Sequence, residues 1–176
     1  MKKILFVAIL TTVAITACKK KDTSTPTPTP TPTPVDTNKA TSRYDALTTD
    51  KWKITAVHMS KGDTLIVDYY DGQMKDCEKD NFIFFNKSGS ITSDEGATKC
   101  DASAAQITTD GSWTLNSDTT MFTIKDSKIL PISGTATAKV ILIDKTNFKI
   151  SKDTTIVYPG IGSISGTIYA NFTKVK

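Results

Sequence analysis

Residues 163–174, SISGTIYANFTK, alternate between two kinds of side chain. The even-numbered positions from Ile164 to Phe172 are apolar or glycine, whereas the odd-numbered positions are polar or tyrosine. A period of two residues is that of a β-strand with one buried and one solvated face. Similar segments, rich in β-branched and aromatic residues, are 51–59, 64–70, 81–86, 90–93, 112–116, 120–125, 135–143, 147–152 and 156–158. About ten short β-strands are therefore expected.

Short turns separate these segments, for example at 61–63, 88–89 and 144–145. Closely spaced strands with short connections pair with antiparallel neighbours. The expected fold class is all-β, an antiparallel up-and-down β-barrel, with a β-sandwich as the alternative. Residues 43–176 would form it, because this length suffices for one hydrophobic core and is too short for two ordinary domains. Only residues 42–49 are compatible with a helix, of a single turn.

The N-terminus has the pattern of an export signal. Lys2 and Lys3 precede the apolar run 4–15, which is shorter than the roughly 20 residues of a membrane-spanning helix. The run ends in Ile15-Thr16-Ala17-Cys18, which resembles the lipobox of bacterial lipoproteins. That resemblance implies a signal peptide over residues 1–17 and lipidation of Cys18. An ordinary secretory signal cut nearby is the alternative.

Residues 25–34 are consecutive Thr-Pro units. Each proline fixes its own φ and keeps the preceding threonine out of the helical region, so the segment is extended, at about 3.1 Å per residue. Residues 18–42 are therefore predicted to be a disordered, lipidated Thr/Pro-rich tether that holds the domain away from the membrane. Lys19 follows the cysteine, and in the lipoprotein family this favours the outer membrane of a Gram-negative bacterium. Either the periplasmic or the extracellular face is compatible with the sequence.

The net charge of +4 comes from this N-terminal region. Five lysines lie in the first 21 residues, and the chain from Val35 onward carries 17 basic and 17 acidic side chains. A neutral domain lacks the basic surface that binds nucleic acid. His58 is the single histidine, and its neighbours suggest no catalytic triad. We therefore expect a non-enzymatic protein with no catalytic residue, cofactor or metal site, and a hydrolase with an unrecognised site is the least favoured hypothesis.

The cysteines Cys77 and Cys100 remain when Cys18 is lipidated. A two-residue hairpin turn at 88–89 would place Phe85 opposite Thr92 and, further out, Cys77 opposite Cys100. Export to an oxidising compartment makes a disulfide between them the expected state. A redox-active or metal-binding pair is the alternative.

Three segments resemble the lipocalin-like domains of bacterial outer-membrane lipoproteins, namely 47–54, 77–85 and 111–115. The resemblance implies a closed barrel of about eight strands whose interior holds side chains or one small apolar ligand. Two features depart from the wider lipocalin pattern. Asp50 stands where glycine usually precedes the tryptophan, and the one arginine, Arg43, lies upstream, so no late arginine can stack on Trp52.

Large apolar side chains on the predicted strands either line a cavity or fill the core. The candidate ligand-binding residues are Trp52, Phe82, Phe84, Trp113, Phe122 and Phe172, with Leu115 beside them. The leading hypothesis is a lipid-anchored envelope lipoprotein that binds or carries a small hydrophobic ligand. The alternative is a surface interaction module that contacts glycan or another envelope protein through exposed aromatic residues such as Tyr69, Tyr70 and Tyr158.

Overall fold

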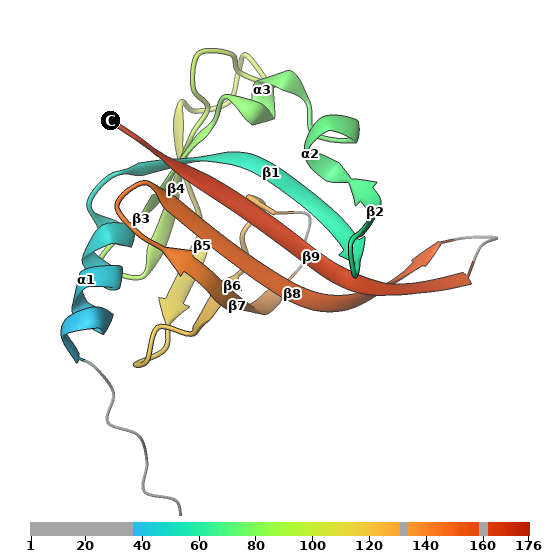
Figure 1. Cartoon of the computed structure of the whole chain (residues 1–176). Coiled ribbons are helices and arrows are strands. Elements are labelled where there is room, and N and C mark those ends of the chain that lie inside the picture. The colour runs from blue at the N-terminus through green and yellow to red at the C-terminus, as the bar shows by residue number, and fades with distance from the viewer. Residues whose placement is uncertain (1–36, 131–133, 159–161) are drawn as a thin grey trace, which may run out of the picture. The chain divides into compact units, whose positions relative to one another are not determined.

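The computed structural model describes residues 37–130, 134–158 and 162–176, so the predicted signal peptide, the predicted lipidation site Cys18 and most of the predicted tether lie outside the described residues. Within the described residues, nine antiparallel strands form one sheet. Strand β1 pairs with both β3 and β9, which closes eight of the strands into a barrel, and β2 is an extra strand beside β1 (Figure 1). The predicted barrel is confirmed, and the sandwich alternative is excluded.

The strands are β1 (Lys51–Lys61), β2 (Thr64–Asp68), β3 (Phe82–Phe85), β4 (Ser90–Asp94), β5 (Ile107–Leu115), β6 (Met121–Lys125), β7 (Thr135–Ile143), β8 (Asn147–Tyr158) and β9 (Gly162–Val175). The helices are α1 (Thr37–Thr48), α2 (Tyr69–Gly72) and α3 (Asp76–Lys79). Two of the predicted strands, 147–152 and 156–158, are one continuous strand, β8. The short helices α2 and α3 were not predicted; they lie between β2 and β3.

Strand β9 closes the barrel by pairing with β1, and along this pairing its apolar residues face the interior. Its register with β1 runs from Lys51 opposite Val175 to Ser60 opposite Thr167. Ala170 and Phe172 of the apolar face are buried, while Thr173 is exposed. The predicted two-residue period is therefore confirmed where β9 faces the interior of the barrel.

Helix α1 closes one end of the barrel (Figure 1). It begins at Thr37, earlier than the expected start of the folded domain at residue 43, and it is longer than the expected single turn. Leu47 is fully buried, and the hydroxyl of Tyr44 donates to the carbonyl oxygen of Lys87 at 2.9 Å. Because short helices are marginal in water, this packing against the barrel end stabilises α1 more than local preference does.

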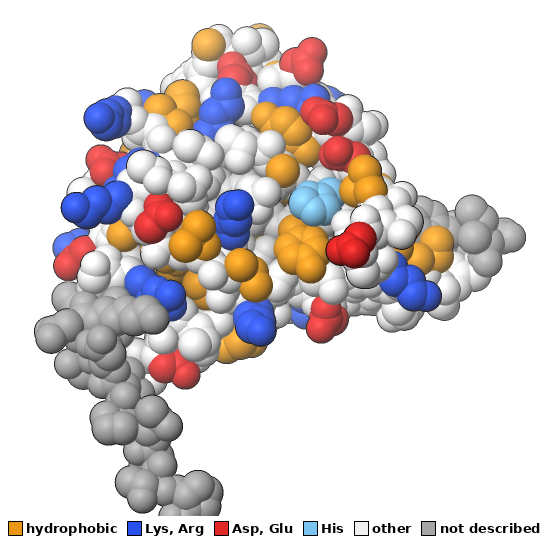
Figure 2. Space-filling model, viewed as in Figure 1, with side chains coloured by type: hydrophobic (Ala, Val, Ile, Leu, Met, Phe, Trp, Pro, Cys, Tyr) orange, Lys and Arg blue, Asp and Glu red, His pale blue; other side chains and the backbone are white. Residues whose placement is uncertain are grey.

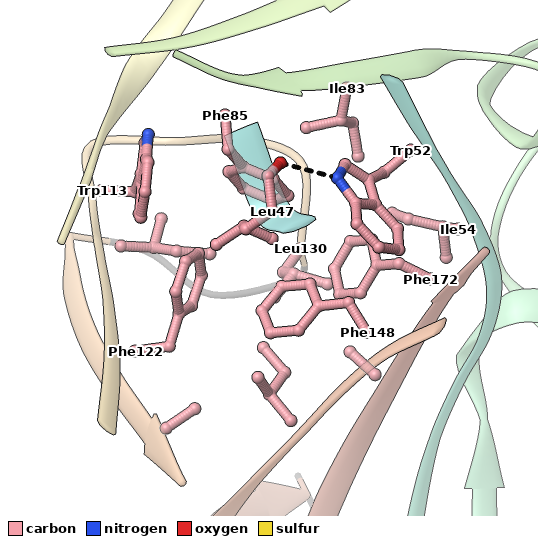
Figure 3. Close-up of a cluster of buried hydrophobic side chains, with 14 of the residues drawn as sticks. Leu47, Trp52, Ile54, Ile83, Phe85, Trp113, Phe122, Leu130, Phe148 and Phe172 are labelled. Atoms are coloured by element: carbon pink, nitrogen blue, oxygen red, sulfur yellow. Dashed lines mark hydrogen bonds between the residues drawn. The ribbon is translucent and has the colours of Figure 1, made fainter. Parts of the chain in front are cut away.

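Aromatic side chains fill the barrel next to α1 (Figure 3). The ring of Phe85 lies in edge-on contact with four other rings, at centroid distances of 5.4–6.2 Å. Those four rings belong to Trp113, Phe122, Phe148 and Phe172. The indole nitrogen of Trp52 donates to the carbonyl oxygen of Leu47 at 2.8 Å, which joins α1 to this aromatic cluster.

In the wider lipocalin pattern an arginine late in the chain stacks on the tryptophan of the first strand. This chain has no such arginine, and a lysine lies over Trp52 instead. The ammonium of Lys174, in β9, lies 5.6 Å from the centroid of the Trp52 ring and 3.0 Å from Asp50 Oδ2. The Lys174 side chain is only 13% exposed, so a cation–π contact and an ion pair act together in a poorly solvated place. Asp50, which departs from the lipocalin pattern, is the ionic partner of that lysine.

The β3–β4 hairpin has a different register from the predicted one. Phe84 lies opposite Thr92 and Phe85 opposite Ile91, a shift of one residue. The cause is a three-residue loop, 87–89, between Asn86 and Ser90, in which Gly89 adopts a positive φ of 86°. Three-residue loops commonly have a left-handed last residue, for which glycine is best suited. The prediction of a two-residue turn is wrong.

The predicted disulfide between Cys77 and Cys100 is nevertheless present, with a Cα–Cα distance of 5.2 Å. The β3–β4 ladder ends at Phe82 and Asp94, so the two cysteines do not face each other on paired strands. Cys77 lies in α3, and Cys100 lies in the loop between β4 and β5. The bond therefore links a helix to a loop, and the register argument that predicted it was wrong.

The turn between β7 and β8 depends on Asp144. Its Oδ1 accepts hydrogen bonds from the backbone amides of Thr146 and Asn147, both at 2.7 Å. These bonds, the one from Thr146 first, lower the pKa of the Asp144 carboxyl group. A carboxylate whose pKa is lower in the folded chain stabilises the fold above its unfolded pKa. That contribution is lost as the pH falls through the folded pKa.

We expect Asp144→Asn to lower the free energy of unfolding at neutral pH by less than about 1 kcal/mol, because solvent screens the carboxylate. The difference from the wild type should shrink as the pH falls below about 4, because the carboxylate of the unfolded wild-type chain is protonated there, and that of the folded chain follows at lower pH. Urea unfolding near pH 6 and near pH 3 measures it. Asp63→Asn is the control, since the Asp63 side chain accepts no hydrogen bond among the described residues. A difference that is the same at both pH values would contradict the expectation.

Candidate ligand-binding site

Four of the predicted ligand-binding residues, Trp52, Trp113, Phe122 and Phe172, are buried in the aromatic cluster (Figure 3). Their rings lie against one another and against Phe85 and Phe148, with centroids 5.0–6.2 Å apart. Such contacts are those of a packed core. Leu115 is partly buried and packs against the same cluster. Of the two readings of these side chains, the structure favours core over cavity lining.

The other two predicted residues, Phe82 and Phe84, lie on the outer face of the barrel. The buried residues of β3 are Ile83 and Phe85, and the ammonium of Lys51 lies 4.2 Å from the centroid of the Phe82 ring. The prediction that Phe82 and Phe84 point inward is wrong. Four consecutive apolar residues show no alternation, so the sequence of β3 does not reveal which face is buried.

A hollow of about 700 Å³ lies at the end of the barrel away from α1. We call it the mouth pocket. Residues from or next to α2, α3 and the ends of β3, β4, β5 and β6 surround it. Its lining residues are Ile54, Tyr69, Gln73, Met74, Glu78, Asn81, Ile83, Ser93, Glu95, Cys100, Thr108, Thr109, Asp110, Asp126, Lys128, Ile129 and Leu130.

The mouth pocket changes in polarity from its floor to its rim. Ile54, Ile83 and Leu130 are buried members of the hydrophobic core and also line the pocket, so they form an apolar floor. Ser93 and Thr108 lie opposite each other on β4 and β5, nearer the rim. Small-molecule sites usually combine apolar surface with convergent polar groups. The mouth pocket has both, and ten of its seventeen lining residues are polar or charged.

A β-bulge turns Asp110 toward the pocket. Ser90 lies opposite Ser112, but Thr92 lies opposite Thr109, so β5 has one extra residue at this point. Gly111 has a φ of 81°, and a Cβ there would collide with the carbonyl oxygen of Lys125. Bulges of this kind redirect a side chain, often beside a functional site. In the sequence, Gly111, two residues before Trp113, is the signal that could have predicted this bulge.

The redirected Asp110 fixes one wall of the pocket. Its carboxylate accepts hydrogen bonds from the Ser127 hydroxyl at 3.0 Å and from the Lys128 amide at 3.0 Å. Ser127 is buried, and Asp126 before it adopts a positive φ of 55°. The segment that leads to Leu130 is therefore held by a carboxylate and a buried hydroxyl.

The disulfide fixes another part of the wall. It ties α3, which carries Glu78, to the loop that follows β4. In the amide orientation that satisfies its hydrogen bonds, the Asn81 nitrogen donates to the carbonyl oxygens of Glu95 at 3.0 Å and Cys77 at 2.9 Å. The covalent bond and these two hydrogen bonds hold helix and loop together at the rim.

The charged lining of the pocket is mostly negative. The lining includes one basic residue, Lys128, and four acidic residues, Glu78, Glu95, Asp110 and Asp126. The Lys128 side chain is exposed, whereas Glu78, Glu95 and Asp110 are half-buried. On the face of the domain seen in Figure 2, by contrast, basic and acidic side chains are interspersed.

A second hollow lies on the β8–β9 hairpin, and its polar groups bind one another. Thr167 donates to Asp153 at 2.6 Å, and the Thr155 and Ser165 hydroxyls are 2.8 Å apart. It has no apolar floor, because polar residues and Gly166 line it. The mouth pocket is the better candidate site.

Two of the three aromatic residues suggested for an interaction surface, Tyr69 and Tyr70, are less exposed than predicted. Tyr69 and Tyr70 are half-buried and pack against the core, and Tyr69 also lines the mouth pocket. The ammonium of Lys79 lies 5.2 Å from the centroid of the Tyr70 ring. The side chain of Tyr158 lies outside the described residues.

His58 stacks on Tyr169 on the outside of the barrel, with ring centroids 5.3 Å apart, and is the pale blue side chain in Figure 2. In the described ranges, no three His, Cys, Asp or Glu side chains are grouped so that they could hold a metal ion. No helix in the described part of the chain is long and apolar enough to cross a membrane. No protein-family model matches this chain, and no curated protein matches it.

Proposed function

We propose that this protein is a non-enzymatic, lipid-anchored envelope lipoprotein whose barrel binds a small hydrophobic molecule in the mouth pocket. The observation that carries the proposal is an apolar floor, made by Ile54, Ile83 and Leu130, beneath an accessible hollow of about 700 Å³. That volume is within the range of about 300–1,000 Å³ found for small-molecule sites. Both walls of the hollow are held in place, which favours a pre-formed site.

The anchoring part of the proposal rests on the sequence of residues 1–42. The lipobox-like Cys18 would carry the acyl chains, and the Thr-Pro segment would separate the barrel from the bilayer. Membrane fractionation of cells that express the wild type or Cys18→Ser tests this. The wild type should sediment with outer membranes, and Cys18→Ser should be lost from that fraction. Equal sedimentation of the two chains would contradict lipid anchoring.

We expect the full chain carrying Cys18→Ser to bind the neutral fluorescent probe N-phenyl-1-naphthylamine with a Kd on the order of micromolar. This variant carries no acyl chains and keeps every residue of the barrel. Thr108→Phe should weaken binding by at least about tenfold, because Thr108 lines the pocket and a phenyl ring would occupy it. The probe's fluorescence enhancement on titration measures the affinity.

Thr114→Phe is the matched control, since Thr114 is exposed on the same strand and lies outside the pocket lining. It should leave the Kd unchanged. Absence of saturable binding to the parent chain would overturn the proposal. An equal loss with Thr114→Phe would place the binding elsewhere.

A second candidate function, interaction with another envelope protein, is favoured by the end of the β8–β9 hairpin. The pairing of β7 with β8 extends to Ser151 and that of β1 with β9 to Thr167. Beyond these points β8 and β9 pair with each other as a two-stranded ribbon, seen at the right of Figure 1. Residues 154–166 contain no charged side chain, and Val157 is 71% exposed. Exposed strand edges usually carry charges that prevent pairing with another chain, so this ribbon suits strand addition.

In-cell photo-crosslinking from position 157, with position 63 as control, tests this second function. A discrete adduct that forms only from position 157 is expected if the ribbon pairs with a partner. Equal yields from the two positions, or none from either, would argue against it.

A further inference from the structure

We infer that the ligand of the mouth pocket carries a positive charge, as an apolar body with an ammonium group. The inference rests on the proposed function, since it names the chemical class of the molecule bound there. It follows from the position of the charges relative to the apolar floor.

The half-buried charged residues of the pocket lining are acidic. Glu78 lies on α3, Glu95 follows β4, and Asp110 lies at the bulge in β5, so the first two carboxylates belong to the wall fixed by the disulfide and the third to the other wall. The basic residue of the lining, Lys128, is exposed, as is the fourth carboxylate, that of Asp126. A charge is less screened by water when it is half-buried, so the inner rim has a negative potential.

The three carboxylates differ in the hydrogen bonds that they already accept within the protein. Asp110 binds Ser127 and the Lys128 amide, and Glu78 Oε2 accepts the Lys75 amide at 2.9 Å in the capping box of α3. The Glu95 carboxylate makes no hydrogen bond or ion pair within the described residues. Glu95 is therefore the group best placed to take a new cationic partner.

The apolar floor of the pocket indicates that the rest of the ligand is apolar. A small inorganic cation would gain nothing from Ile54, Ile83 and Leu130, and the described residues include no grouping suited to a metal ion. A fatty acid would fill the apolar floor but would bring its carboxylate beside three half-buried acidic groups, which costs binding energy. A molecule with an apolar chain or ring and an ammonium group satisfies both parts of the pocket.

Competition with N-phenyl-1-naphthylamine tests the inference on the full chain carrying Cys18→Ser. The competitors are octylammonium, octan-1-ol and octanoate, which share an eight-carbon chain and differ in charge. We expect octylammonium to bind at least about tenfold more tightly than octan-1-ol, and octanoate to bind most weakly. The preference for octylammonium should fall as salt is added.

Glu95→Gln locates the charge recognition. It should weaken octylammonium binding by about three- to tenfold and leave octan-1-ol binding unchanged, because only the charged competitor uses the carboxylate. Asp63→Asn removes a similar charge at a residue outside the pocket lining and should change neither affinity. Equal affinities for octylammonium and octan-1-ol, or an equal effect of Asp63→Asn, would overturn the inference while probe binding upholds the proposed function. Failure of the probe itself to bind would instead reject the proposed function.

Discussion

Phe85→Ala should lower the free energy of unfolding by about 3–5 kcal/mol, the cost typical of removing a buried phenyl ring. Phe85 is 1% exposed and contacts four aromatic rings from four different strands. Those rings cannot all move into the vacated space, because each is also held by its own neighbours, so a cavity would remain. Chemical denaturation followed by far-UV circular dichroism measures the change.

Phe84→Ala is the matched control for that variant. Phe84 is the preceding residue of the same strand and points to the outer face, where it is half-buried. Its removal should cost about 1 kcal/mol or less. If Phe84→Ala were as damaging as Phe85→Ala, the assignment of the two faces of β3 would be wrong. If Phe85→Ala prevents folding at physiological temperature, the conservative variant Phe85→Leu should still fold and should show the same order of effects against Phe84→Leu.

Removal of the disulfide should have the next largest effect. The double variant Cys77→Ser, Cys100→Ser is expected to lose about 3–4 kcal/mol, because the bond closes a loop with a sequence separation of 23 residues. For a domain of this size the loss corresponds to a fall in Tm of roughly 10 °C. Differential scanning calorimetry measures both quantities.

A reductant provides the control for the disulfide variant. Dithiothreitol should lower the Tm of the wild type toward that of the double variant and should leave the double variant unchanged. An unchanged wild-type Tm in dithiothreitol would mean either that the bond is inaccessible or that it does not stabilise the fold. An unchanged Tm in the double variant itself, relative to wild type, would contradict the prediction directly.

The same double variant separates stability from binding. The disulfide holds α3 and the loop after β4 at the rim of the mouth pocket, whereas the aromatic cluster lies at the other end of the barrel. Loss of the bond should therefore weaken binding of N-phenyl-1-naphthylamine at temperatures where the chain is still folded. Phe84→Ala, whose side chain lies on the outer face of β3 and outside the pocket lining, should not weaken it.

Some features of the site were open to sequence reasoning and others were not. The correct cysteine pair was predicted from a register that proved to be wrong by one residue, because export and the number of cysteines limited the choice as strongly as geometry did. The direction of Phe82 and Phe84 was predicted wrongly, since β3 is apolar on both faces. The mouth pocket was not predicted at all, because its residues are spread over many segments and include ordinary loop residues.

The sequence by itself determined the all-β class, the antiparallel pairing of neighbouring strands and the inward face of β9. These follow from a two-residue alternation and short turns, which are local properties of the chain. The tertiary structure alone decided which face of β3 is buried, that Lys174 would lie over Trp52, and that the bulge at Gly111 would turn Asp110 toward the pocket. Each of these depends on contacts between residues far apart in the chain, and closure of the barrel is what brings those residues together.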